Sequence, residues 1–484
     1  MSKKQKSLKL NFIMNAILAM SSFIFPLISF PYVSRVLLPI GTGRISFATS
    51  LISYFQMFAQ LGIPTYGIRV CAKARDNRIE LTRTAHELLI INLVMSIFSY
   101  LILAVALIFV PRLREDRILY IIISMTIFLS AIGMEWLYKA LEEYSYITFR
   151  SIVFKIIAII AMFILIRKQE DYVIYGGITI FASSASNILN FINVHKYIEM
   201  KPVGNYNLKR HLQPILVFFA MACATTIYTN LDTVMLGFMT TNVDVGYYNA
   251  AIKIKTILVS VVTSLGTVLL PRASYYIEQG YAEEFRKISK KALNFVILLS
   301  FPLVIYFVLF AKEGIYFLSG SAYAGAVFPM QLIMPTLILI GITNILGIQI
   351  LIPQGREKIV LYSEIVGAII DLIINWLLIP KLASAGAAIG TLIAEFSVLV
   401  VQYLALKKDI NDMLISIHYL RIIIAVVIAC IPAVFIKILA IGNFATLMIS
   451  AIVFWGIYGV VLILTKESLV IELLSQVLNK IRKC

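Results

Sequence analysis

The chain is poor in charged residues and in the residues that build metal or disulfide frameworks. Only 14% of its 484 residues are charged, against about a quarter in a typical soluble domain. Its four cysteines and four histidines are scattered without close spacing, so no disulfide framework and no zinc site is predicted. The sequence therefore predicts neither a secreted disulfide scaffold nor a resident metal or cofactor.

Polar stretches long enough to form a soluble domain are also lacking. The longest polar connections hold about twenty residues, and no GxxxxGK nucleotide loop occurs. A membrane-bound glycosyltransferase or polymerase would carry a large loop with paired catalytic side chains. We therefore expect no enzyme activity, and no ATP-driven transport by this chain alone.

Long apolar blocks dominate instead, with 60% hydrophobic residues and a mean hydropathy of +0.92. The blocks are about twenty residues long, enough for a helix to cross the roughly 30 Å hydrocarbon layer. Lipid-exposed backbone must satisfy its own hydrogen bonds, and the short alternating segments of a barrel are missing. The pattern predicts an all-α polytopic membrane protein with about fourteen transmembrane helices. The predicted spans are 11–34, 44–63, 86–110, 118–138, 147–166, 172–195, 213–238, 249–270, 292–311, 327–351, 358–380, 386–406, 419–440 and 444–465.

Basic residues are distributed unevenly between the two sides of these spans. The side that holds the N-terminus carries 29 Lys and Arg and the other side 12, with Lys155 inside a span. Cytoplasmic loops carry the excess, so both termini are predicted to be cytoplasmic. This topology signal accounts for the net charge of +17, and no nucleic-acid partner is predicted.

Two similar segments suggest an internal repeat. Gly43 and Gly246 each follow a charged residue and a short outer loop, and each precedes an alanine by five positions. The 203 residues between them span six predicted helices, so the first helix pairs with the seventh. We expect two parallel six-helix lobes, at 1–211 and 212–410, followed by two further helices and a tail at 411–484.

Charged and polar side chains inside predicted spans are functional candidates, because burying them in lipid is costly. Glu364, Asp371 and Asn375 are spaced by seven and four residues, on one face of a helix. Asp232 and Glu395 lie in other spans. These carboxylates are candidates for carrying a coupling ion, a proton or Na+. The alternatives are a packed hydrogen-bond network for the Asp371 face, a position at the outer interface for Asp232, and a pair with a neighbouring helix for Glu395.

Four basic residues are candidates for contact with an anionic substrate. Arg35 and Lys155 are the better placed, since a phosphate crossing a low-dielectric layer needs cationic partners. Lys253 and Lys255 are two positions apart, about 200° around a helix, and cannot both face one cavity. At least one of them is expected to extend to the interface.

Several ordered motifs resemble the polysaccharide repeat-unit flippases of the Wzx type, in the multidrug/oligosaccharidyl-lipid/polysaccharide exporter superfamily. They extend from about residue 10 to residue 410. The motifs are FPYVSRVLL (30–38), GIPTYGIR (62–69), EWLYKALEEY (135–144), NLDTVMLG (230–237), VGYYNAA (245–251), IPQGREK (352–358) and GAAIGTLIAE (386–395). Lys139-Ala140 stands where Gln-Gly is common in these relatives.

The resemblance implies two six-helix lobes in a V around a cationic central cavity in the bacterial cytoplasmic membrane. An undecaprenyl-pyrophosphate-linked oligosaccharide would be carried by alternating access, for surface polysaccharide synthesis. The sugar would pass through the cavity while the polyprenyl chain stays in the bilayer lipid. A polysaccharide polymerase is the implied partner and an ion gradient the implied energy source. An ion-coupled multidrug antiporter and a peptidoglycan-precursor flippase are the alternative functions.

Overall fold

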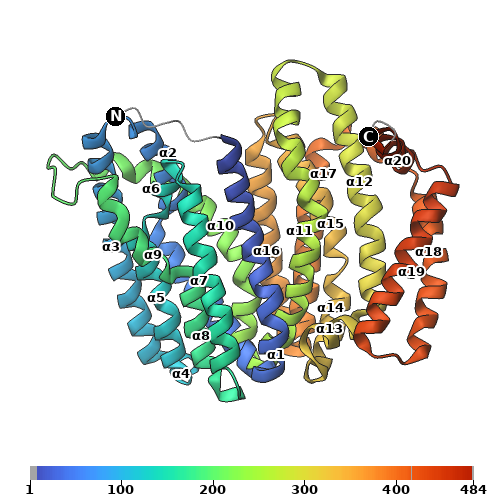
Figure 1. Cartoon of the computed structure of the whole chain (residues 1–484), viewed down its shortest axis with the longest axis horizontal. Helices are drawn as coiled ribbons and strands as arrows, with labels where there is room; N and C mark the ends of the chain where they lie inside the picture. Colours follow the sequence, from blue (N-terminus) through green and yellow to red (C-terminus); the bar gives the residue numbers. More distant parts are fainter. Residues whose placement is uncertain (1–7, 416, 482–484) are drawn as a thin grey trace. The chain divides into compact units, whose positions relative to one another are not determined.

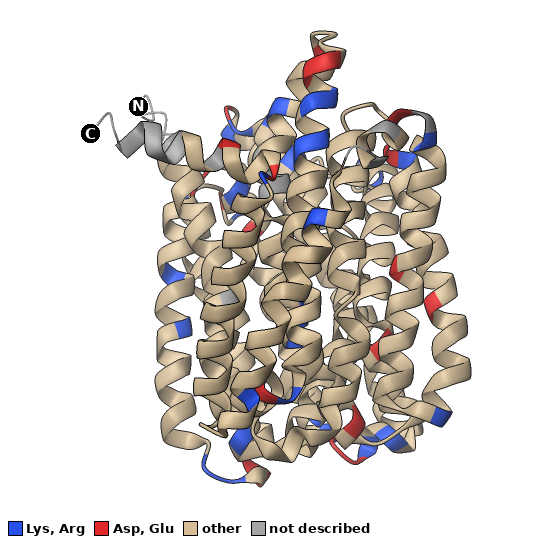
Figure 2. Cartoon of the chain, turned by 90° about the vertical axis from the view of Figure 1, so that its right-hand side faces the viewer, with Lys and Arg blue, Asp and Glu red and all other residues tan. Residues whose placement is uncertain are grey.

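The computed structural model describes residues 8–415 and 417–481, and within these ranges the regular elements are helices, with no strand. The all-α prediction is confirmed. The chain divides into two compact units, Met1–Gly246 and Tyr247–Cys484. Most charged residues lie near the two ends of the helices, and few lie in their long middle portions (Figure 2). This distribution is that of a multi-pass membrane protein, because charge inside hydrocarbon is costly.

The helices of the first unit lie side by side, with α1 against α3, α5, α7 and α10 (Figure 1). The last helix to begin in this unit, α11, continues into the second. In chain order the helices are α1 (Leu8–Gln60), α2 (Ile63–Ala74), α3 (Arg78–Phe109), α4 (Pro111–Arg114), α5 (Arg117–Gly133), α6 (Glu135–Ala140), α7 (Tyr144–Leu165), η1 (Gln169–Asp171), α8 (Tyr172–Ile180), η2 (Phe181–Ala185), α9 (Asn187–Asn193), η3 (Val194–Lys196), α10 (Lys209–Met239) and α11 (Asn242–Glu278).

The second unit is built around α12 and the antiparallel pair α16 and α17, with the hairpin of α18 and α19 packed on α12. Tyr306 of α12 stacks on Phe310 at 4.8 Å and contacts Phe454 of α19. The helices are α12 (Ala282–Leu309), α13 (Ala311–Ser319), η4 (Ser321–Ala326), α14 (Val327–Ile333), α15 (Thr336–Asn344), η5 (Ile345–Leu351), α16 (Glu357–Leu382), α17 (Ser384–Ile415), α18 (Tyr419–Phe435), η6 (Ile436–Leu439), α19 (Asn443–Leu464) and α20 (Ser468–Ile481).

Length and hydropathy identify 11 candidate membrane spans in the described residues, or up to 12 if the bent pair Ser321–Ile333 and Thr336–Leu351 is one span. The stretch Leu10–Ala74 contains two of the predicted spans, and Arg117–Gly133 is apolar but only 17 residues long. The difference between fourteen and eleven therefore has three sources: the first two predicted spans lie in one stretch, the fourth is too short, and the tenth is the bent pair. The exact count of fourteen stays a prediction.

A break in α1 separates its first two predicted spans. Leu38 has φ 59 and ψ 177, far from helical values, and Pro39 follows it. Proline disfavours the helical conformation in the residue before it, and a positive φ is strained for leucine. The break therefore marks where one span ends and the next begins.

The two glycines of the predicted repeat meet just beyond this break. A Cβ atom on Gly43 would lie 1.7 Å from the carbonyl oxygen of Asn242, and one on Gly246 would lie 2.1 Å from that of Pro39. Arg112 of α4 also contacts the two helices next to this approach. It donates to the Gly237 carbonyl of α10 at 3.0 Å and to the Asn242 side chain of α11 at 2.8 Å. Only glycine permits so close an approach of two backbones.

A candidate substrate cavity in the first unit

Four adjoining cavities, of about 180 to 410 Å³, lie among the helices of the first unit. Neighbouring cavities share lining residues, and Glu135 lines three of them. Their walls carry many hydroxyl and amide groups. The polar lining residues are Ser22, Thr49, Ser53, Gln56, Gln60, Thr65, Asn92, Thr126, Ser130, Glu135, Lys139, Ser151, Lys155, Thr179, Ser183, Ser184, Asn187, Thr226 and Asn230.

Two local irregularities present these side chains. Met134 has φ 43 and ends α5, so the chain turns and Glu135 begins the short helix α6 beside the cavities. The π-helical turn η2 contributes Ser183 and Ser184 to the lining, and the Thr126 and Ser184 hydroxyls lie 2.9 Å apart. Such π-turns inside α-helices occur frequently at functional sites.

Glu135 forms ion pairs with two basic side chains. Its carboxylate lies 2.8 Å from Lys139 Nζ, one turn along α6, and 3.2 Å from Arg150 Nη2 of α7. The Arg150 side chain is only 3% exposed and also donates to the Ser186 hydroxyl. The Lys139 side chain is 33% exposed and lines two of the cavities. Arg150 is therefore a buried anchor for Glu135, whereas Lys139 is accessible from the cavities.

Lys155 is the predicted substrate residue that lies in this site. It lines the 410 Å³ cavity, and its Nζ donates to Ser21 Oγ at 2.8 Å and to Ser22 Oγ at 3.1 Å. Both serines belong to α1, so Lys155 of α7 links the two helices. The hydrogen-bond partners of Lys155 are hydroxyls, which carry no negative charge. Within the described residues, no carboxylate lies at hydrogen-bond distance from the Lys155 ammonium group.

The other predicted basic residues lie elsewhere. Arg35 is exposed on α1 and donates to the Pro31 carbonyl one turn back. Lys253 and Lys255 are half-buried on α11, in the second unit, and neither makes a hydrogen bond or ion pair with the part of the chain that the structure describes. The structure therefore groups Lys155 with Lys139 rather than with these three.

The predicted carboxylates fall into different settings. Asp371 is 2% exposed and accepts a hydrogen bond from Asn375 Nδ2 at 3.1 Å. Both side chains lie against Gly390 of α17, where an added Cβ would be 2.2 Å from Asn375 Oδ1. Glu395 of α17 and Asp232 of α10 are also buried, and Glu364 is half-buried on α16. Asp371 and Asn375, which the spacing predicts to share one helical face with Glu364, are hydrogen-bonded to each other in α16.

Sequence reasoning missed the Glu135 cluster as a site. The motif EWLYKALEEY was used only for its resemblance, although Glu135 and Lys139 are four residues apart, the spacing of a helical ion pair. The pairing was a detectable signal, but the 410 Å³ cavity beside it was not, because its walls come from five separate helical segments, α1, α6, α7, α8 and η2.

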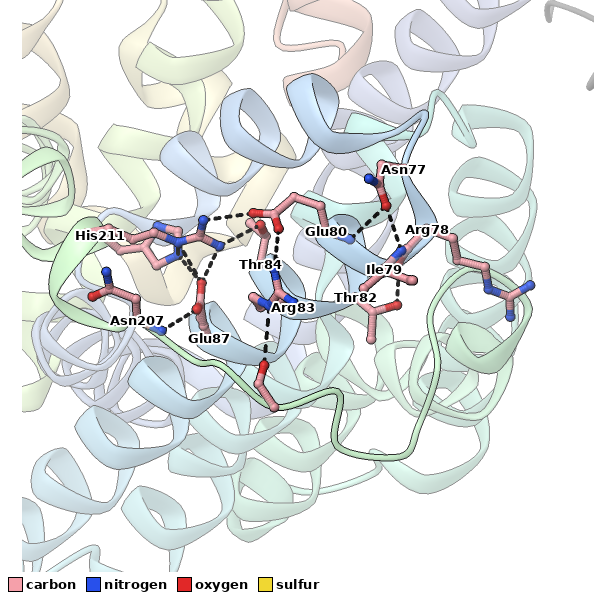
Figure 3. Close-up of polar contacts among 12 residues, drawn as sticks. Asn77, Arg78, Ile79, Glu80, Thr82, Arg83, Thr84, Glu87, Asn207 and His211 are labelled. Atoms are coloured by element: carbon pink, nitrogen blue, oxygen red, sulfur yellow. Dashed lines mark hydrogen bonds and ion pairs between the residues drawn. The ribbon is translucent and has the colours of Figure 1, made fainter.

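A second polar cluster was also missed, and it fixes the start of α10 to α3 (Figure 3). Glu87 of α3 is fully buried and accepts from the Asn207 backbone N–H at 2.6 Å and from Arg210 at 2.6 and 2.9 Å. His211 Nε2 lies 2.7 Å from the same carboxylate, and its Nδ1 lies 2.8 Å from the Tyr66 hydroxyl. The contacts hold the polar segment before α10 against the body of the unit.

Comparison with known proteins places this architecture in a family. The family described as "Polysaccharide biosynthesis protein" matches residues 8–277, and the MatE family matches residues 218–377. The "Putative O-antigen transporter" of Escherichia coli (strain K12) is 25% identical over 397 residues, which cover 82% of this chain and 95% of that protein.

Solved structures show the same fold. The lipid II flippase MurJ, in an inward closed conformation, aligns with a TM-score of 0.71 at 15% identity, covering 95% of this chain and 99% of MurJ. An inward-facing multidrug resistance MATE family transporter of the MOP superfamily aligns with a TM-score of 0.62 at 13% identity, covering 84% and 99%. Because the polysaccharide match alone spans more than half of the residues, the chain belongs to the polysaccharide biosynthesis protein family.

Proposed function

We propose that this protein is a flippase that carries undecaprenyl-pyrophosphate-linked oligosaccharide repeat units from the cytoplasmic to the outer leaflet of a bacterial inner membrane. The family, and a relative named as an O-antigen transporter, support a role in surface polysaccharide synthesis. The chain acts as a transporter and not as an enzyme.

The observation that carries this proposal is the polar cavity of the first unit. Hydroxyl and amide groups line it, and such groups exchange hydrogen bonds with sugar hydroxyls as water does. Lys139 and Lys155 line the 410 Å³ cavity together with Glu135, which leaves a net positive charge where a phosphate needs it. A cavity for an uncharged or cationic drug would not require two lysines.

For energy coupling we propose a proton or Na+ bound at Asp371. A buried carboxylate with an amide neighbour supplies oxygen ligands for a small cation or a site for a proton. Asp232, Glu364 and Glu395 are the further candidates for ion coupling. The remaining proposed cavity residues are Arg35, Lys253, Lys255 and Asn375. The proposal also includes two lobes, at 1–211 and 212–410, and a tail region at 411–484. Both termini are proposed to be cytoplasmic, and a polysaccharide polymerase is the proposed partner.

Gene deletion with complementation tests the function. Loss of surface polymer, with lipid-linked repeat units accumulating on the cytoplasmic face, is the expected result. Asp371→Asn and Lys155→Gln should fail to restore polymer at matched expression, whereas Lys437→Gln, a lysine of the second unit, should restore it. Intact polymer after deletion would refute the proposal, and a changed sensitivity to cationic drugs would then favour the multidrug antiporter, to which the MatE match points.

A further inference from the structure

Lys139 stands out because it has one weak partner and access to two cavities. Its ion pair with Glu135 joins side chains that are 33% and 37% exposed, and such pairs contribute little stability. Glu135 does not depend on Lys139, since the buried Arg150 holds the same carboxylate from the other side. Lys139 can therefore leave Glu135 without stranding an unpaired buried charge.

We propose that Lys139 and Lys155 form a phosphate site in the first unit, and that Glu135 holds Lys139 while the site is empty and releases it when a phosphate enters. This inference rests on the proposed function and adds to it the location and the release mechanism of the phosphate contact. Both lysines line the 410 Å³ cavity. Ser22, Ser151 and Thr179 line the same cavity. The Ser22 and Thr179 hydroxyls donate to backbone carbonyls, whereas the Ser151 hydroxyl has no hydrogen bond within the described residues and can serve as a further donor.

Charge balance favours the exchange. A pyrophosphate carries more negative charge than one carboxylate and offers more acceptor oxygens, so it competes successfully for a lysine that is already partly solvated. Lys155 has hydroxyl partners, Ser21 and Ser22, and needs to break no ion pair to bind the anion. When the phosphate leaves, Lys139 returns to Glu135, and the site does not retain two uncompensated charges facing each other.

Lys139 gives the cavity a second cation beside Lys155. Its position four residues after Glu135, on the same face of α6, provides the neutralising partner for the empty state.

Binding of undecaprenyl pyrophosphate to the purified full-length protein in nanodiscs tests the proposal. Lys139→Gln should weaken binding about tenfold or more, the effect expected when a charge-assisted hydrogen bond is lost. Glu135→Gln should tighten binding several-fold, because it removes the competing carboxylate and still accepts from Arg150. A merely structural ion pair would shift both variants in the same direction, and that result would overturn the exchange.

Control variants test whether a change in binding comes from this site, and control ligands test which phosphate compound the site recognises. Lys437 and Glu313 form a similar pair at 3.3 Å in the second unit, and Lys437→Gln and Glu313→Gln should leave binding unchanged. Undecaprenol should not bind at this site, and inorganic pyrophosphate should compete. If phosphatidylglycerol binds equally well and with the same dependence on Lys139, the site recognises any phospholipid headgroup and the assignment to the carrier lipid is refuted.

The failure of this inference differs from failure of the proposed function. If Lys139→Gln binds normally and restores polymer in the deletion strain, the phosphate site is wrong and the flippase function stands. If deletion leaves polymer intact and the wild-type protein binds no undecaprenyl lipid, the proposed function itself fails.

Discussion

Replacing Glu87 by alanine removes the carboxylate on which four hydrogen bonds converge, from the Asn207 backbone, from two nitrogens of Arg210 and from His211. Glu87 is fully buried and the His211 side chain is 1% exposed, whereas the Arg210 side chain is 36% exposed and also pairs with Glu80 at 2.8 Å. Breaking a buried charge pair costs about 3–5 kcal/mol. Arg210 can turn to solvent and to Glu80, so we expect the lower end, about 3 kcal/mol.

For a unit of this size, that loss corresponds to a fall of roughly 6–12 °C in the unfolding temperature. Thermal unfolding of the purified protein in detergent, followed by loss of the monodisperse peak, measures it. Glu472→Ala is the matched control, since its pair with Lys291 at 2.7 Å joins half-exposed side chains and should contribute less than about 1 kcal/mol. Equal, small shifts for the two variants would refute the role of Glu87 in fixing α10 to α3.

Three further variants test other parts of the argument. Gly43→Ala should prevent correct packing, because its Cβ would lie 1.7 Å from the Asn242 carbonyl oxygen. Gly456→Ala is the control and should be tolerated, since no atom lies within 4 Å of its added Cβ. The yield of folded protein is compared for the two variants, and equal yields would contradict the close approach of the two backbones at Gly43. Lys466→Gly should raise the free energy of unfolding by up to about 1 kcal/mol, because this exposed residue just after α19 has φ 52, in the left-handed region that favours glycine. A lower unfolding temperature for this variant would refute the prediction. Asp371→Asn should abolish polymer export while the protein stays folded; unchanged export would exclude Asp371 from coupling.

Much of the architecture follows from local sequence. Apolar blocks of about twenty residues predict helices because the bilayer leaves the backbone few alternatives. Pro39 predicts the interruption of the first helix, and the repeat spacing identifies Gly43 and Gly246 as related positions. The seven- and four-residue spacing of Glu364, Asp371 and Asn375 predicts a shared face, and Asp371 and Asn375 do bond to each other.

The site depends on contacts that no local pattern encodes. Glu87 and His211 are 124 residues apart in sequence, and Lys155 lies 134 residues from Ser21. Glu87 and His211 lie at the edges of predicted spans and Lys155 lies within one, but only their distant partners determine which contacts they make. The free energy of a buried charge is set by the groups around it, and helix packing brings those groups together. Periodicity and composition thus determined the membrane class, the helices and the candidate charges, whereas tertiary packing alone decided which charges meet, which are anchored by a buried partner, and which face the cavity.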